Sequence, residues 1–235
     1  MTLLTICQNT LKRCKASEIP LTIVSNNTDT AKLVFSAARD GTTIVKEATD
    51  WQKLIKTHSF NTVSSQAIYD LPNDIEDTKL LPNTFWNATT RFQLEGPLNL
   101  GDWQLLKNWP LISTIIQNFI ILNDQVNIYP VPTSVASLNY MYITKKIIRS
   151  EGGSEQSEWL ADNNYSILNE YAIELQTSWI YLKQLGRPYD EEKLKADTYL
   201  ETLIKQDGSR KVIGVNMREI APYRPNVSWL GAVIK

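Results

Sequence analysis

The fold class is decided by residues 44–71, which read IVKEATDWQKLIKTHSFNTVSSQAIYDL. Up to about Lys56, large apolar side chains recur at three- and four-residue steps, which is the spacing of one face of an α-helix. This stripe begins upstream at Leu33, so the spacing predicts one long helix over about residues 29–56. From His58 onward the apolar side chains alternate, as they do in a β-strand. The change of period predicts a helical region followed by a β-rich one.

The β-rich region begins with two short alternating runs. Residues 60–63 and 67–71 flank the turn-prone sequence Ser64-Ser65-Gln66, so the pattern predicts a hairpin closed through that turn. Proline residues and Asn/Asp pairs divide the sequence that follows into short segments. Three further elements are predicted: a helix over 99–109, a hairpin over 119–129 around Asn123-Asp124, and a strand over 138–143.

Helices flank this β-rich region on both sides in the sequence. Helical apolar spacing predicts a first helix over about 2–15, a third that starts near Asn164 or Ser166, and a fourth from Asp190 to Gly208. Helices that flank an insert bury their apolar stripes against one another, so we expect one antiparallel bundle. The predicted fold class is α+β. It comprises an antiparallel helical bundle (1–57 and 160–206), a β-rich insert (58–150) and an extended C-terminal arm (207–235).

Gly41 lies on the apolar stripe of the long second helix. Glycine inside a helix costs about 1 kcal/mol relative to alanine. This cost is tolerated where another backbone has to approach closely. We therefore expect a second helix to pass next to Gly41.

The composition argues against several classes of protein. The 24 Lys and Arg residues nearly balance the 25 Asp and Glu residues, so no global basic field exists for sequence-independent DNA binding. Cys7 and Cys14 lie two helical turns apart, too far for a disulfide, and are expected in the core. With His58 as the only histidine, no Cys/His metal site can form, and we expect no metal and no cofactor.

The N-terminus and the apolar runs are informative about location. Residues 1–6 lack the charged start, apolar run and cleavage site of a signal peptide. No apolar stretch approaches the roughly 18 residues that a membrane span needs. We expect a soluble protein that is made in the cytoplasm and binds no membrane.

Two groups of carboxylates are the candidates for chemistry. Glu170 and Glu174 lie four residues apart on one predicted helix face, and such pairs are far more often solvated than catalytic. Asp74, Glu76 and Asp77 cluster after a proline, but they lack the spacing and the glycine of a calcium loop. His58 has no Gly-x-Ser-x-Gly turn to work with. We predict that the protein is not an enzyme and has no catalytic residues.

The arm from Asp207 to Lys235 is rich in large apolar residues, which a disordered tail usually lacks. Tyrosine, tryptophan and arginine are the residue types favoured as interface hot spots. We expect the arm either to dock on another subunit or to fold back on its own core, and the first alternative is preferred. The predicted partner-binding residues are Ile220, Tyr223, Arg224, Trp229 and Leu230.

An ordered set of short motifs over residues 1–207 resembles the head-to-tail adaptor family of short-tailed bacteriophages. In chain order the motifs are MTLLTICQ (1–8), ATDWQKL (48–54), AIYDLP (67–72), TFWNATTR (84–91), LEGPL (94–98), DWQ (102–104) and YPVP (129–132). The two closing helices resemble the closing hairpin of that family.

The resemblance implies a structural virion protein at the head–tail junction. It implies a twelve-membered ring of this chain below the portal, bridging the portal to the tail nozzle, with double-stranded DNA passing through the lumen without sequence-specific binding. It also implies that the C-terminal arm reaches the portal while the β insert faces the tail. Two alternatives stay open: a phage-encoded peptidoglycan hydrolase (muramidase), and a tail structural protein that does not contact the portal.

Overall fold

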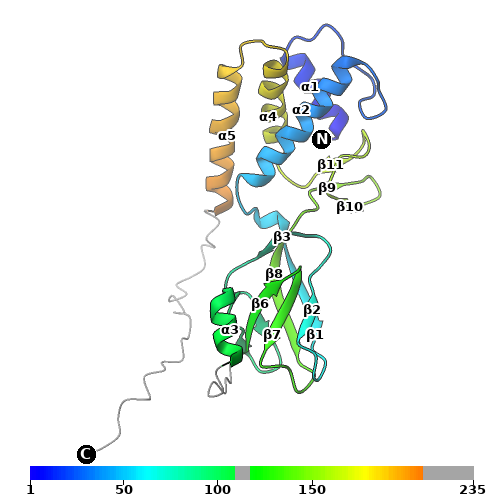
Figure 1. Ribbon diagram of the computed structural model, residues 1–235. Helices are drawn as coiled ribbons and strands as arrows, with labels where there is room; N and C mark the ends of the chain where they lie inside the picture. The colour runs from blue at the N-terminus through cyan, green and yellow to red at the C-terminus, as the bar shows by residue number, and fades with distance from the viewer. Residues whose placement is uncertain (109–116, 209–235) are drawn as a thin grey trace, which may run out of the picture.

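A computed structural model describes residues 1–108 and 117–208. The chain forms five α-helices and three antiparallel sheets within these residues, so the α+β class is confirmed. Figure 1 shows the helices α1, α2, α4 and α5 gathered at one end and two of the sheets at the other. We call these parts the helical subdomain and the β subdomain.

The helical subdomain is built around α4 (Glu170–Gln184), of which nine of fifteen residues are buried. The other three helices pack on it: α1 (Leu3–Arg13), α2 (Asp29–Glu47) and α5 (Asp190–Gly208). Side-chain oxygens of Thr2, Thr28 and Asn169 cap the first turns of α1, α2 and α4. Cys7 and Cys14 are both buried in the core of this subdomain, as predicted.

Gly41 of α2 lies against the backbone of α4, as predicted. A Cβ atom at this position would lie 2.9 Å from the backbone nitrogen of Thr177 and 3.0 Å from its Oγ1. Next to it, the indole N–H of Trp159 donates to Thr42 Oγ1 at 3.0 Å. The glycine therefore permits a close helix contact that any side chain would block.

The β subdomain contains two sheets that share one core. In the first, the long strands β1 (Ile55–Asn61) and β8 (Ser137–Thr144) pair over all seven residues of β1. The shorter strands of this sheet are β3 (Ile75–Leu80), β4 (Trp86–Asn87) and β5 (Phe92–Gln93). The second sheet has the order β2-β7-β6, with β2 (Ile68–Asp70), β6 (Asn118–Leu122) and β7 (Gln125–Tyr129). The helix α3 (Leu100–Asn108) packs on Ile120 of this sheet through Trp103 and Leu106.

A third, small sheet connects the two subdomains. It has the order β10-β9-β11, with β9 (Ile148–Arg149), β10 (Glu155–Gln156) and β11 (Tyr165–Ser166). Figure 1 shows this sheet beside the helices, directly above the β subdomain. Thr2 bridges to Tyr165, so the start of α1 is joined to the same sheet.

The prediction of one helix over 29–56 is wrong at its C-terminal end, because α2 ends at Glu47. Trp51 folds back on the helix, and its indole N–H donates to the carbonyl of Val45 at 2.7 Å. The last carbonyls of a helix need such partners. Trp51 and Leu54 remain buried in the helical core through the 3-10 helix η1 (Gln52–Leu54). The apolar spacing therefore continues although the α-helix does not.

The predicted hairpin between residues 60–63 and 67–71 is also wrong. β1 begins at Ile55 and pairs with β8, whereas β2 pairs with β7. An alternating pattern identifies a strand but not its partner, because hairpin and long-range pairing require the same alternation. The third helix starts at Glu170, later than predicted, because Asn169 provides the cap and residues 165–166 form β11.

Other predicted elements are confirmed. β6 and β7 form the expected hairpin, and Asn123 and Asp124 have φ values of 51° and 58°, as a tight two-residue turn requires. The predicted strand over 138–143 lies within β8, and the predicted short helix corresponds to α3. The fourth helix runs from Asp190 to Gly208, so Asp207 and Gly208 belong to α5.

Candidate functional site: the charged junction between the subdomains

The five partner-binding residues predicted in the arm, Ile220, Tyr223, Arg224, Trp229 and Leu230, lie outside the described residues. In residues 1–108 and 117–208, no helix combines the length and the apolar character needed to cross a membrane. Because the five predicted residues lie outside the described part of the chain, the candidate site consists of other residues.

Glu170 and Glu174 both contact the N-terminal part of the chain, Glu170 at Met1 and Glu174 on α1. The side chain of Glu174 is 6% exposed and accepts hydrogen bonds from Arg13 Nη2 at 2.7 Å and Asn9 Nδ2 at 3.1 Å. The carboxylate of Glu170 pairs with the amino group of Met1. Two cavities of about 330 and 80 Å³ lie in the β subdomain, and neither is lined by these residues. The contacts of Glu174 tie α1 to α4.

Two of the three clustered carboxylates after Pro72 are held by lysines. Asp74 accepts from Lys56 Nζ at 2.9 Å, and Glu76 pairs with Lys46 Nζ at 2.7 Å. Lys46 lies on α2 and Glu76 on β3, so this ion pair links the helical subdomain to the β subdomain. In the part of the chain that the structure describes, no three His, Cys, Asp or Glu side chains lie close enough to hold a metal ion.

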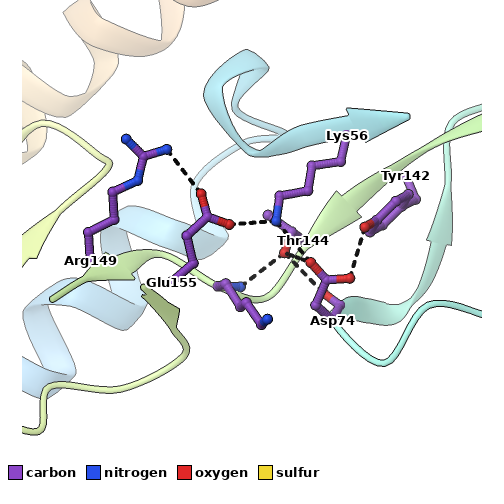
Figure 2. A network of polar contacts seen from close by, with 7 residues as sticks. Lys56, Asp74, Tyr142, Thr144, Arg149 and Glu155 are labelled. Atoms are coloured by element: carbon purple, nitrogen blue, oxygen red, sulfur yellow. Dashed lines mark hydrogen bonds and ion pairs between the residues drawn. The ribbon is translucent and has the colours of Figure 1, made fainter. Parts of the chain in front are cut away.

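Lys56 is the centre of a polar network that spans the junction. At the start of β1, its ammonium group contacts Asp74 on one side and Glu155 on the other, at 2.9 and 2.6 Å. Glu155 lies on β10 and also accepts from Arg149 Nη2 of β9 at 3.0 Å. Figure 2 shows the resulting chain of contacts, from Arg149 through Glu155 and Lys56 to Asp74.

Two residues of β8 complete the network. Tyr142 donates its hydroxyl to Asp74 Oδ1 at 2.8 Å, and Thr144 contacts Oδ2 of the same carboxylate at 3.0 Å. The carboxylate of Asp74 therefore has contacts from β1 and β8, and the side chain is only 15% exposed. Both carboxylate oxygens are occupied, so the group is held in one orientation.

The electrostatics follow from these contacts. Burial on its own would raise the pKa of Asp74, but hydrogen bonds from Lys56, Tyr142 and Thr144 outweigh it and lower this pKa to about 2. Burial and the hydrogen bond to Asp74 raise the pKa of Tyr142 to about 12. Hydrogen bonds from Lys56 and Arg149 lower the pKa of Glu155. At neutral pH the network therefore stays in its fully ion-paired form.

A second set of bonds joins the end of α5 to the same junction. The backbone N–H of Gln52 donates to Asp207 Oδ2 at 3.0 Å, and its side-chain amide donates to the Asp207 carbonyl at 2.8 Å. The last turn of α5 is thus held beside η1, immediately before β1 begins. The described part of the chain ends at this junction.

His58 lies in the core side of β1 and has a structural environment. Its ring packs on Phe60 and Tyr140, with centroid distances of 5.8 and 5.3 Å. Burial lowers its pKa, with an opposing contribution from Asp74.

The network consists of ion pairs and hydrogen bonds that join the two subdomains. The carboxylates of Asp74 and Glu155 are neutralised by cations. The network fixes how the β subdomain is oriented on the helical one. Sequence reasoning identified Asp74 only as part of an acidic loop, and it missed Lys56, Arg149 and Glu155. Lys56 and Glu155 lie 99 residues apart in the sequence, so no local pattern links them.

Comparison with models of known protein families finds no family that matches this chain, and comparison with curated proteins finds no match either.

Proposed function

We propose that the protein is a structural virion protein that forms a ring at the head–tail junction of a short-tailed bacteriophage. In this proposal the ring joins the portal to the tail nozzle and continues the channel for double-stranded DNA, which it does not read. Twelve copies, as in the family that the sequence resembles, would close the ring. The finer architecture belongs to the same proposal: an antiparallel helical bundle, an inserted β-rich subdomain and a C-terminal arm.

The charged junction is the observation that most supports this role. An adaptor has to present one surface to the ring above and another to the ring below, at a fixed distance and angle. Lys56 contacts Asp74 and Glu155 from the start of β1, and Lys46 of α2 pairs with Glu76 of β3. These contacts stiffen the connection between two subdomains that bear different surfaces. A hydrolase would instead need a carboxylate that faces a substrate cleft.

The two lateral sides of the molecule also suit a ring. Closure by rotation requires that each copy present two different surfaces to its neighbours. In Figure 1 the helix α5 lies on one side of the helical subdomain, and the loop between α1 and α2 together with β10 lies on the other. That loop is anchored, because the backbone N–H groups of Ile23 and Val24 donate to the carboxylate of Asp162. Leu21 in this loop is 84% exposed and available for a neighbour.

The arm supplies the proposed contact to the portal. Tyr223 and Trp229 are the anchors in this proposal, and Ile220, Arg224 and Leu230 add apolar area and charge around them. Gly208, the last residue described, lies at the junction, and 27 residues follow it in the sequence.

Co-sedimentation with portal rings tests the proposed function. The full chain is expected to sediment with the portal, and a chain ending at Gly208 is expected to stay in the supernatant. The double variant Tyr223→Ala/Trp229→Ala should behave like the shortened chain, whereas the matched variant Lys211→Ala/Lys235→Ala should bind. Equal sedimentation of all four proteins would exclude the arm as the portal contact and leave a tail protein that does not touch the portal.

A separate experiment tests the hydrolase alternative. Zymography on peptidoglycan is expected to show no clearing by the full chain. Clearing that disappears in both Glu170→Gln and Glu174→Gln would establish the hydrolase and contradict the proposed function.

A further inference from the structure

Within residues 1–108 and 117–208, β1 is an edge strand with one side unpaired. In the order β1-β8-β4-β5 it is the terminal strand, and in this part of the chain it pairs only with β8. It is seven residues long, with regular register and no proline. Native proteins usually protect such edges by shortness, bulges, proline or covering segments.

The register identifies which backbone groups point away from the sheet. The carbonyls of Ser137 and Met141 on β8 accept from Ala88 and Leu81, on the side opposite to β1. In an antiparallel pair the direction of the backbone groups alternates along each strand. On β1, Asn61 pairs with Ser137 and Thr57 pairs with Met141. Ser59 lies two residues from each, so its backbone groups point in the same direction as theirs. The N–H and C=O groups of these three residues therefore point outward.

Within the described residues these outward N–H groups have no hydrogen-bond acceptor. The side chains of Thr57, Ser59 and Asn61 are exposed and uncharged, so no lysine or glutamate on these positions repels an incoming strand. On the core side of β1, the rings of His58 and Phe60 are only half-buried. The edge therefore offers both free donors and incompletely covered apolar surface.

The described part of the chain ends close to the start of β1. Asp207 is bonded to Gln52, and β1 starts three residues after Gln52. Three to five residues after Asp207, at about 3.3 Å per residue, the chain reaches residues 210–212. Because Asp207 is bonded to Gln52, a strand that starts near these residues can begin level with the start of β1.

The sequence that follows has the composition of a strand. Residues 211–217 read KVIGVNM, with Ile213, Val215 and Met217 at alternate positions and no proline. From these observations we infer that residues 211–217 add to the free edge of β1 of the same chain as a parallel strand. Ile213, Val215 and Met217 face His58 and Phe60, and the outward groups of Thr57, Ser59 and Asn61 receive partners.

This strand addition is independent of the proposed portal contact. It concerns the base of the arm, whereas Tyr223 and Trp229 lie beyond it. Residues 218–235 follow the added strand and extend about 60 Å at most. The base can be fixed whether or not the distal residues bind a portal.

Amide hydrogen exchange tests the inference directly. In the full chain, the N–H of Ser59 is expected to exchange at least tenfold more slowly than in the variant Ile213→Asp/Val215→Asp. The N–H of Phe60 points toward β8 and serves as the internal control, with equal protection in both proteins. Equal exchange of Ser59 in the two proteins would overturn the inference.

A disulfide experiment distinguishes the same chain from a second copy. The variant Ser59→Cys/Asn216→Cys is expected to form a disulfide within one chain under mild oxidation, and the buried Cys7 and Cys14 do not compete. The control Ser36→Cys/Asn216→Cys places the first thiol on the exposed side of α2, where no disulfide is expected. A disulfide between two chains, or none at all, would contradict the assignment. Because neither experiment contains portal, their failure leaves the portal proposal standing.

Discussion

The ammonium group of Lys56 lies 2.6 Å from a carboxylate oxygen of Glu155, 99 residues further along the chain. The same ammonium group lies 2.9 Å from Asp74. One side chain at the start of β1 therefore connects the β subdomain to the small sheet that packs on the helices. The orientation of the two subdomains depends on a cation that no local sequence pattern would single out.

Replacement of the charged Lys56 side chain should destabilise the fold. In Lys56→Met, the carboxylates of Asp74 and Glu155 lose a partner in a partly buried site, so we expect a loss of about 1–3 kcal/mol in the free energy of unfolding. Urea denaturation followed by tryptophan fluorescence measures it. In the control Lys79→Met, the lost partner is Asp50 at 3.9 Å and both side chains are more than half exposed. A change below about 0.5 kcal/mol is expected there, and equal losses in the two variants would contradict the account of the junction.

The low pKa of Asp74 predicts a specific loss of stability in acid. Its folded pKa, about 2, lies below the ordinary value of 3.8. A group with a depressed folded pKa contributes stability above its ordinary pKa and loses it as the pH falls toward the folded value. The urea midpoint should therefore decline between about pH 4.5 and pH 2. In Asp74→Asn the decline should be shallower, and an unchanged pH profile would show that Asp74 is not linked to folding.

The close contact at Gly41 predicts that a methyl group is harmful there. Alanine has the higher helix propensity, so Gly41→Ala would gain about 1 kcal/mol on an open helix surface. Here the new Cβ would lie 2.9 Å from the backbone of Thr177, so we expect a net loss of about 1–3 kcal/mol. Ser36→Ala on the exposed side of α2 is the matched control, with no loss expected. A more stable Gly41→Ala protein would mean that α2 and α4 lie further apart.

The hydrogen bond from Trp51 to the Val45 carbonyl should stabilise the end of α2 by a measurable amount. Trp51→Phe keeps most of the buried ring but removes the N–H that donates to the Val45 carbonyl. A buried carbonyl without a partner costs about 1–2 kcal/mol, which thermal unfolding would detect. The control is Trp86→Phe, in which the lost bond to Asn83 is at 3.2 Å and the ring is 43% exposed. Similar losses for both variants would argue against the cap.

The helical part of the fold could be predicted from the sequence because its signals are local. The apolar stripes and the glycine that ends α5 act within one or two turns, whereas the cap at Asn169 was missed and the third helix was predicted to start too early. Gly41 even predicted the close approach of a second helix. The end of α2 was missed because Trp51 and Leu54 keep the helical spacing while the backbone has already turned.

The pairing of strands could not be predicted in the same way. β1 alternates as a hairpin strand would, but its partner lies some eighty residues downstream. The same limit applied to the junction, because Lys56, Asp74 and Glu155 are brought together only by that long-range pairing. The Asn123-Asp124 turn was predicted correctly because both residues tolerate positive φ and the two strands adjoin it.

Native mass spectrometry of the protein with and without portal rings tests the central proposal most directly. We predict that the isolated chain is largely monomeric and that the mixture contains a complex of one portal ring with a closed set of twelve copies. A protein that forms stable rings without portal would contradict the proposed order of assembly. A protein that stays monomeric in the presence of portal would contradict the adaptor function itself.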